Sequence, residues 1–527
     1  MPQYQPLLIS DFKTGMYKAK EPWLKPKDAW ENLSNMRVEN GILQKNKGYS
    51  AFLTTGQSNP IVGWFKSAYN QQHSILVADT KRLYRMYPTN ETLVELTSGD
   101  TFTGNDYQYF RFANYINQTV ITNWKNPLYV FNDQTDSVGE VDTGINIDRA
   151  KYIFAWKNRL HLIGTVETNV PHLNRHRWSD VNSLNFTATN FTDGSDAGIP
   201  EAATGIVFVR GEPHVMFRSQ VVPITSTRDI SNPFFWDIER STNTVGSIAE
   251  NFAIPYEDGA IVLNQRNIEF YAGQQGQSID VPELRDFIDD MGIMSWHYIT
   301  GSITGDKKFL YMIYTNTTNA YPTVPNRILR VNLQEGERSF SESTIAMHSV
   351  FGYDGFSSPI FDKVDLIWTG NDAASMSAMN IDVNFQLRIP TQTYAGNATG
   401  SIFKLDSGTD HAGSTIAIEA LSPRINPFAP EGRQVRLGEV GFYGDNNNAS
   451  FTASFYKSTE ETTPYATRTI TFTSGTSTQD KSWETVNLGG EMGRFHRIKI
   501  SHDASANEPK IHAIEVFVAP GAPLRQA

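Results

Sequence analysis

The residues best suited to chemistry are carboxylates in the segment DVPELRDFIDD, residues 280–290. They could line a channel, coordinate a metal ion, or simply end a solvated helix. Glycoside hydrolysis needs two carboxylates that face each other across a substrate, and spacing along the chain places no such pair. The channel-lining candidates are therefore Glu283, Asp286, Asp289 and Asp290, and we predict no catalytic pair.

Two histidines have a spacing that could suit a metal. His172 and His176 lie four residues apart in PHLNRHRW, but no strong third ligand is near them, and Arg175 and Arg177 add positive charge. The chain also lacks a P-loop, a G-x-S-x-G elbow and an H-E-x-x-H motif. We therefore expect no enzyme activity, no metal site and no cofactor.

The overall composition favours an all-β protein without disulfides. The chain has 527 residues, of which 39% are hydrophobic and 12% aromatic, enough for two or more domains with sizeable cores. Aromatic residues are typical of strands, and the frequent Gly, Asn, Thr and Ser are typical of turns. The absence of cysteine excludes thiolate metal sites and fits synthesis in a reducing cytoplasm.

Charge and hydropathy argue against two further classes. The formal net charge is −11 and the pI is near 5.5, which disfavours a DNA-binding protein with a basic face. The opening residues MPQYQPLLIS lack the features of a signal peptide. No stretch approaches the roughly 18 apolar residues of a membrane helix. We expect neither specific DNA binding nor membrane insertion.

The elements that must position any site are short hairpins that recur through the middle of the chain. Each reads as an apolar strand, a polar turn and a second, often aromatic strand, as in a propeller blade. We predict a β-propeller over residues 56–390, with six blades, or seven if the hairpin at 205–219 stands alone. The other six segments are 73–88, 117–132, 158–167, 259–273, 308–333 and 365–380.

The pattern changes after the propeller. Residues 391–415 are rich in Gly, Ser and Thr and predict a linker. Six alternating strands follow within residues 416–527, which favours a C-terminal β-sandwich that folds alone. In FHRIKI, Phe495 and Ile498 differ in parity, so a bulge or burial of both faces is predicted there, with Arg494 and Arg497 as interface candidates.

The first 55 residues are too polar and too rich in proline to form one core element. We predict an extended N-terminal arm over residues 1–26, anchored on a neighbour by Trp23 and Trp30. Residues 27–55 are predicted to pack on the body as a short helix over 29–36 and a hairpin around Gly41. Basic residues exceed acidic ones here, which fits docking to an acidic neighbour or, equally, solvated loop lysines.

Taken together, these features resemble a known family. The N-terminal pattern of Asp11, Gly15, Pro26, Ala29, Asn35, Val38, Gly41, Leu43, Lys45 and Gly48, the propeller body and the ending GRFHRIKISHD…IHAIEVFVAPGAPLR resemble tail hub or nozzle (tail tubular) proteins of short-tailed, podovirus-type bacteriophages. The segment 258–290 is similar to a recurrent passage in those proteins. The family has no catalytic residues to carry over.

The resemblance implies a structural virion protein of the phage tail, assembled in the host cytoplasm. Its expected partners are a homo-oligomeric ring, a hexamer by resemblance, a tail adaptor or portal-proximal ring protein, and tail fibres or spikes. DNA would pass only in transit through the ejection channel, and an acidic lumen would not retain it because it offers no counterion release. The alternative is a carbohydrate-binding or glycan-active β-propeller with exposed aromatic platforms.

Overall fold

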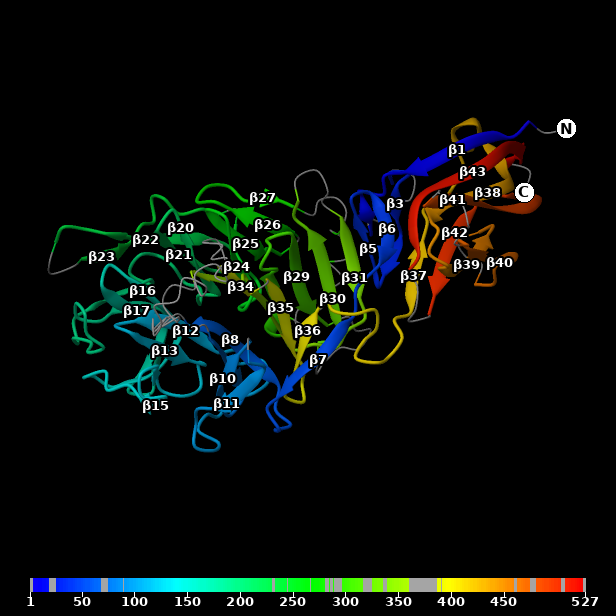
Figure 1. The fold of residues 1–527 in the computed structure, drawn as a ribbon. Coiled ribbons are helices and arrows are strands. Elements are labelled where there is room, and N and C mark those ends of the chain that lie inside the picture. The colour runs from blue at the N-terminus through cyan, green and yellow to red at the C-terminus, as the bar shows by residue number, and fades with distance from the viewer. Residues whose placement is uncertain are drawn as a thin grey trace, which may run out of the picture.

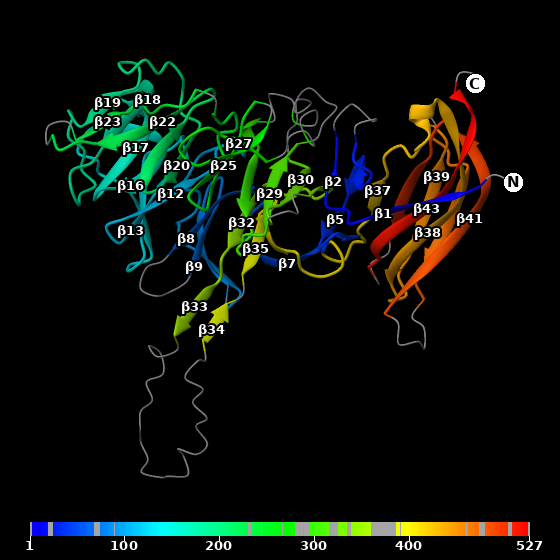
Figure 2. The same ribbon diagram turned by 90° about the horizontal axis from the view of Figure 1, so that it is seen from above.

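The structure is a computed structural model of the chain (Figure 1). It describes residues 3–18, 25–67, 74–88, 90–229, 233–243, 245–265, 267–279, 284, 288, 296–315, 325–334, 339–359, 386–389, 391–458, 462–473, 480–503 and 508–524. The described elements are predominantly strands. They form an elongated body with a group of small sheets at one end and the C-terminal sheets at the other (Figures 1 and 2). The all-β prediction is confirmed.

The larger part consists of four-stranded antiparallel groups. The first group comprises β8 (Ile61–Ser67), β9 (Ser74–Asp79), β10 (Leu83–Tyr87) and β11 (Thr92–Glu95). The second comprises β12 (Arg111–Tyr115), β13 (Gln118–Thr122), β14 (Tyr129–Asn132) and β15 (Ser137–Glu140). The third comprises β16 (Ile147–Trp156), β17 (Arg159–Glu167), β18 (Val170–Trp178) and β19 (Phe191–Asp193).

Four further groups follow. They are β20 (Gly205–Val209), β21 (Glu212–Met216), β22 (Val221–Ser226) and β23 (Phe234–Trp236), and then β24 (Ala253–Tyr256), β25 (Gly259–Leu263), β26 (Ile268–Tyr271) and β27 (Gln277–Ser278). Next come β28 (Thr300–Ile303), β29 (Phe309–Tyr314), β30 (Arg327–Asn332) and β31 (Phe340–Ser343), which continue into a larger sheet. The last group has the order β32 (Ser349–Tyr353), β35 (Gln392–Gly396), β36 (Ser401–Leu405) and β7 (Tyr49–Thr54).

The first strands of these groups lie side by side around a centre. Strand β8 contacts β12 and β32, β12 contacts β16, β20 contacts β24, and β28 contacts both β24 and β32. The N-terminal strand β7 pairs with β36 and completes the last group, so the two ends of this part of the chain share one sheet. The architecture is therefore propeller-like.

Most of the expected hairpins are present. Strand pairs β9–β10, β13–β14, β20–β21, β25–β26 and β29–β30 confirm the predicted hairpins at 73–88, 117–132, 205–219, 259–273 and 308–333. The segment 158–167 is instead one long strand, β17, because its apolar residues continue without a turn. The hairpin expected at 365–380 lies outside the described residues.

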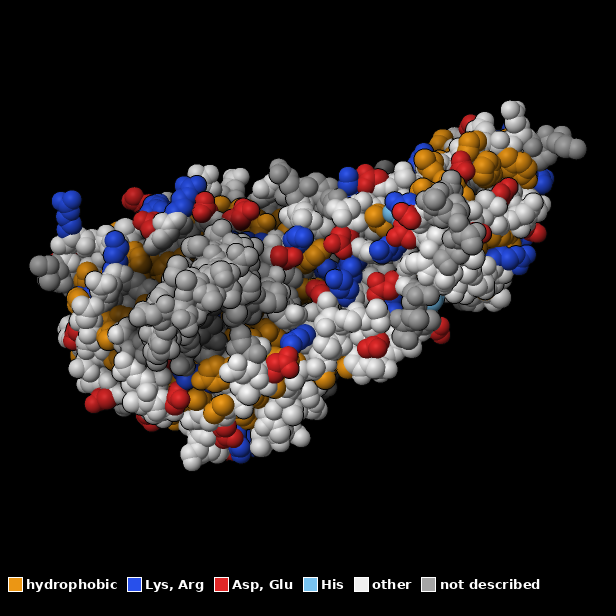
Figure 3. Space-filling view, in the orientation of Figure 1, with side chains coloured by type: hydrophobic (Ala, Val, Ile, Leu, Met, Phe, Trp, Pro, Cys, Tyr) orange, Lys and Arg blue, Asp and Glu red, His pale blue; other side chains and the backbone are white. Residues whose placement is uncertain are grey.

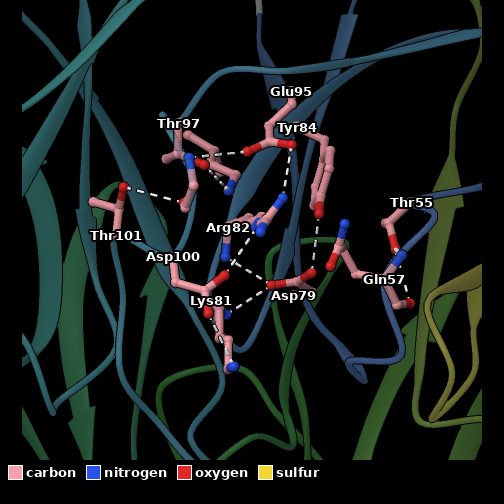
Figure 4. A network of polar contacts seen from close by, with 12 residues as sticks. Thr55, Gln57, Asp79, Lys81, Arg82, Tyr84, Glu95, Thr97, Asp100 and Thr101 are labelled. Atoms are coloured by element: carbon pink, nitrogen blue, oxygen red, sulfur yellow. Dashed lines mark hydrogen bonds and ion pairs between the residues drawn. The ribbon is translucent and has the colours of Figure 1, made fainter.

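The β9–β10 turn shows how polar residues fix a hairpin (Figure 4). Asp79 has no exposed surface, and its carboxylate accepts the backbone N–H groups of Lys81 and Arg82, both at 2.7 Å, and the hydroxyl of Tyr84 at 3.1 Å. Arg82 extends the network to Asp100 and Glu95. One buried carboxylate thus satisfies three donors that the turn would otherwise leave unpaired.

The prediction of a linker over residues 391–415 is wrong for residues 391–405. They form β35 and β36, which pair with each other and with β32 and β7. Gly396 and Gly400 mark close approaches and the turn rather than a flexible segment, since a Cβ at Gly396 would lie 2.3 Å from Ile61. The neighbouring hairpin β33 (Phe356–Pro359) and β34 (Gln386–Ile389) points away from the sheets (Figure 2).

The C-terminal part contains two facing sheets. One is built on β41 (Lys481–Gly493), β38 (Arg433–Asp445) and β43 (Lys510–Pro523), and the other on β37 (Ile418–Leu421), β42 (Arg497–His502), β39 (Ser450–Tyr456) and β40 (Ala466–Thr471). Phe442 and Phe451 pack edge to face between them, with ring centroids 5.2 Å apart. All six expected strands are present, and β41 is an addition. A short 3₁₀ helix, η4 (Ala429–Glu431), precedes β38.

The N-terminal residues join both parts. They form β1 (Gln5–Ser10), β2 (Gly15–Met16), β3 (Ala29–Trp30), β4 (Asn32–Ser34), β5 (Met36–Glu39) and β6 (Ile42–Lys45). Strand β1 pairs with β43 in a register that opposes Leu8 to Glu515, and β4 pairs with both β31 and β37. The predicted helix over 29–36 is wrong because these residues complete sheet edges, whereas the hairpin around Gly41 is confirmed as β5–β6.

Candidate functional site

The candidate site is a cavity of about 400 Å³ at the centre of the propeller-like part. Strands β8, β12, β16, β20, β24, β28 and β32 all contribute to its wall. These are the first strands of their groups, so the packing that forms the ring also creates the cavity. A ligand there would be held by backbone elements that are buried and mutually braced.

Half-buried aromatic rings form part of the wall. Trp64 and Phe351 stack with centroids 6.0 Å apart and planes 3° apart, and Phe65 stacks on Phe112 at 5.4 Å. The indole N–H of Trp64 donates to Ser349 at 2.7 Å, which fixes its orientation. Flat ring faces held in this way suit the apolar faces of sugars or other planar groups.

One side of the cavity carries charge. The Arg111 guanidinium lies 4.2 Å from the ring centroid of Tyr152 and donates to the Glu250 carbonyl oxygen at 3.0 Å and to Asn251 at 2.9 Å. Behind it, Lys151 pairs with Glu250 at 2.8 Å and also donates to the Ala203 carbonyl. The charged groups therefore bind one another and the backbone.

Burial and pairing set the protonation of these groups. Burial lowers the pKa of Lys151, against the opposing effect of Glu250. Burial alone would raise the pKa of Glu250, but Lys151 and Arg111 hold it below its ordinary value. Burial raises the pKa of Tyr152. Glu250 is thus ionised and already paired at neutral pH, an arrangement that favours binding over acid–base catalysis.

The histidines considered as metal ligands have a different setting. His176 is completely buried, and its Nε2 lies 2.9 Å from Nδ1 of His161 within a cluster of aromatic rings. Burial lowers the pKa of both rings, that of His161 to about 3. His172 lies opposite Thr165 on the same sheet. Within the described residues no group of three His, Asp or Glu side chains could hold a metal ion.

Of the two tryptophans predicted to lie at an interface, Trp30 is described by the structure and Trp23 is not. Trp30 is 2% exposed and packs against Phe12 with ring centroids 5.6 Å apart, so it belongs to the core of this chain and not to a neighbour's pocket. Trp23 lies outside the described residues, as do the channel-lining candidates Glu283, Asp286, Asp289 and Asp290.

Arg494 and Arg497 differ in exposure. Arg494 is exposed, next to a groove that Ile425 and Leu524 also line. Arg497 is half-buried and reaches Glu31 at 3.4 Å and the Ser458 carbonyl at 3.3 Å. Phe495 and Ile498 are both buried, but Phe495 precedes β42, so the two side chains do not belong to one regular strand. Only Arg494 is therefore available to another molecule.

Several cationic residues of the N-terminal segment bind within the chain. Lys45 has no exposed surface and donates to the Thr409 carbonyl at 2.9 Å, while Lys25 pairs with Glu31 at 3.4 Å. Both lysines are therefore paired within the chain, an outcome that differs from the two expected alternatives of docking to a neighbour and solvation. The signal for the cavity is the aromatic content of IVGWFKS, which forms β8, and of YFRF, which leads into β12; both lie outside the predicted hairpins.

Comparisons with known proteins add little. No protein-family model matches the chain, and no curated protein does. Among solved structures it is similar to the extracellular domain of a one component system, BT4673 from B. thetaiotaomicron, with 10% identity, a TM-score of 0.40, and coverage of 94% of this chain and 62% of that one. It is also similar to a chain of the Mitotic Checkpoint Complex, with 8% identity, a TM-score of 0.36, and coverage of 70% and 94%. Scores this low carry no argument about function.

Within the described residues, we find no helix with the length and apolarity needed to cross a bilayer.

Proposed function

We propose that this protein is a non-catalytic structural component of a phage tail, a hub or nozzle subunit that assembles into a closed ring around the DNA ejection channel. The proposal starts from the sequence resemblance described above. The observation that carries it in the structure is the continuity of the core between the two parts of the molecule.

One hydrophobic cluster extends from the propeller-like part through the N-terminal strands to the C-terminal sheets. It includes Leu310 of β29, Leu33 of β4 and Ile500 of β42, each with no exposed surface. Because a shared core resists hinge motion, the elongated body should transmit force as one unit. A tail component that withstands DNA ejection needs this property.

The outer surface of the C-terminal part also supports assembly. Leu8 is 55% exposed, Trp483 43% and Met492 38%, and hydrophobic side chains gather over β1 and β43 (Figure 3). Exposed apolar residues grouped in this way are typical of interaction surfaces. Arg494, which is exposed on the same part of the molecule, remains an interface candidate.

We further infer that the propeller has seven blades rather than six. The hairpin at 205–219 belongs to a sheet of its own, β20–β23, and β7 completes a group with β32, β35 and β36. Counting each four-stranded group as a blade gives seven, closed by strands from both ends of the propeller segment. This closure joins the N-terminal strand to the last blade and removes a free edge.

Electron microscopy of the negatively stained, purified protein tests the assembly proposal. We expect closed rings of uniform size with a central opening. Only isolated elongated particles, at every protein concentration examined, would contradict it. Turnover of host polysaccharides or nucleic acids that persists through purification would contradict the non-catalytic part separately.

The central cavity favours a second candidate function, carbohydrate binding. Trp64 and Phe351 present stacked, half-buried rings to a space of about 400 Å³. Binding of neutral oligosaccharides that quenches tryptophan fluorescence, and is lost in W64F while W483F behaves like the wild type, would support it. An absence of quenching across a panel of glycans would leave the structural role alone.

A further inference from the structure

A second cavity, of about 280 Å³, lies away from the central one. It forms where strand β5, the β28–β29 turn, strand β30 and the β35–β36 hairpin meet. Residues from three stretches of the sequence, 37–47, 304–330 and 391–406, therefore contribute to one polar space. The charged residues that line it are Arg37, Glu39, Lys47, Asp306, Lys308, Arg330 and Asp406.

Arg330 is the most unusual of these residues. It is 6% exposed, and its guanidinium lies 3.7 Å from the ring centroid of Phe309, which holds it in place. Among the described residues its closest carboxylate is that of Asp406, 3.5 Å away, which is too far for a strong hydrogen bond. Within the described part of the chain its Nε has no hydrogen-bond partner. A buried guanidinium in this state lacks part of the pairing that its desolvation requires.

The surrounding groups would complete a binding site. Arg37 is also 6% exposed, and it is oriented by Glu39 at 3.0 Å and by the Lys45 carbonyl at 3.2 Å. Lys308 is half-exposed and only 4.0 Å from Asp306. Two buried guanidinium groups and two exposed ammonium groups, those of Lys47 and Lys308, thus line a space that also offers carboxylate acceptors.

We propose that this cavity binds an oxyanion that carries neighbouring hydroxyl groups, namely the phosphate or carboxylate of an acidic or phosphorylated sugar. Arg330 and Arg37 bind the anionic group, because guanidinium groups match planar and tetrahedral oxyanions with paired hydrogen bonds. Asp306 and Asp406 accept hydrogen bonds from the hydroxyls. The cavity volume suits a monosaccharide, at the small end of ligand sites.

Such binding would join the N-terminal hairpin to the propeller-like part. Arg37 belongs to β5, whereas Arg330 lies in β30 and Asp406 directly follows β36, strands of the last two four-stranded groups. A ligand that binds only when these elements are together stabilises the folded chain by mass action. The inference does not depend on ring assembly or on glycan binding at the central cavity.

Isothermal titration calorimetry of the full chain at pH 7 and low ionic strength tests the proposal. The probes are glucose 6-phosphate, glucuronate, inorganic phosphate and, as a neutral control, glucose. We expect saturable binding of at least one sugar acid, weaker binding of inorganic phosphate and none of glucose. The phosphate and carboxylate arms identify which anion the cavity prefers.

Substitutions locate the binding. R330Q should weaken affinity at least about tenfold because it removes a desolvated charged donor, and K308Q should weaken it about threefold. K81Q, which removes an exposed lysine of the β9–β10 turn, should bind like the wild type. K308Q and K47Q keep the test decisive if R330Q does not fold.

Three results would overturn the proposal. They are heats no larger than those of ionic-strength-matched sodium chloride, equal affinity in wild type, R330Q and K308Q, and binding of inorganic phosphate as tight as that of both sugar acids. The first result would mean that the cavity binds none of the anions tested. The last would mean that the hydroxyl groups of the sugar contribute nothing to binding.

Discussion

The two ends of this molecule build sheets in different ways. In the propeller-like part nearly every sheet is made of strands that follow one another in the chain, as in the order β12-β13-β14-β15. In the C-terminal part the sheets recruit β1, β4, β5 and β6 from the opposite end of the sequence. Local contacts can therefore form the first part, whereas the second depends on pairing across almost the whole chain.

The largest effect that this comparison predicts is loss of folding in an isolated C-terminal fragment. Residues 410–527 lack β1 and β6, which pair with β43, and β4, which pairs with β37. We therefore expect the fragment to show collapsed amide-proton dispersion by NMR, in contrast to the independent folding that the sequence alone suggests.

A matched rescue sharpens this prediction. Fusing residues 3–47 to the fragment through a flexible linker should restore dispersed spectra and a cooperative melt. Its control is the same fusion with Phe12 and Leu33, both fully buried, replaced by Ser. Well-dispersed spectra from the unfused fragment would mean that the N-terminal strands are dispensable for its fold.

A single substitution in the other part should act locally but strongly. D79A leaves the Tyr84 hydroxyl and two backbone N–H groups without their acceptor, which should cost about 4 kcal/mol in the free energy of unfolding. D100A removes an exposed carboxylate and should cost much less than D79A. Denaturant unfolding followed by fluorescence compares them, and equal costs would show that the Asp79 network is not structural.

The next prediction concerns two arginines of the C-terminal part whose substitutions should differ in their effect on stability. R497E places a carboxylate beside Glu31, where the side chains are 12% and 17% exposed, and should destabilise the protein by about 3 kcal/mol. R494E changes an exposed residue, so its stability should stay within about 0.5 kcal/mol of the wild type. A melting temperature lowered equally by both substitutions would contradict this assignment.

Acid should destabilise both parts by the same mechanism. Burial lowers the pKa of His214 and of His496 to about 4, below the ordinary value of 6.5. The unfolded chain therefore binds protons that the folded chain does not, and stability falls as pH drops from 6.5 toward 4. Each histidine contributes a slope of up to about 1.4 kcal/mol per pH unit.

Substitutions test this slope in each part. H214Q in the propeller-like part and H496Q in the C-terminal part should each flatten the pH dependence of the free energy of unfolding between pH 6 and pH 4.5. H172Q provides the control, because His172 is half-buried on the sheet surface. An unchanged slope in H214Q and H496Q would mean that these rings titrate normally in the folded chain.

The same contrast explains what could be predicted from the sequence. Hairpins such as β9–β10 and β25–β26 depend on alternation and turn residues that are adjacent in the chain, so the pattern reveals them. Residues 29–36 have helical spacing, but they are strands because β31 and β37 offer open edges to them. Tertiary pairing of this kind leaves no local signal.

The candidate sites were missed for a related reason. Strand β41 was not predicted because few of its residues are buried. Residues 391–405 have the Gly, Ser and Thr content of a linker, but in the folded chain their glycines allow close packing against neighbouring strands. The central cavity arises only when seven first strands meet, and the second cavity brings Arg37 within reach of Arg330. The spacing of residues along the chain does not predict such contacts between distant segments.

The measurement that tests the central proposal most directly is sedimentation velocity of the full chain over a hundredfold range of concentration. We predict one dominant species with the mass of a closed oligomer, six times the 59.2 kDa chain by the family resemblance, that persists on dilution. A species of 59.2 kDa at every concentration, or an open series of aggregates without a closed form, would contradict the assignment of this protein as a ring-forming tail component.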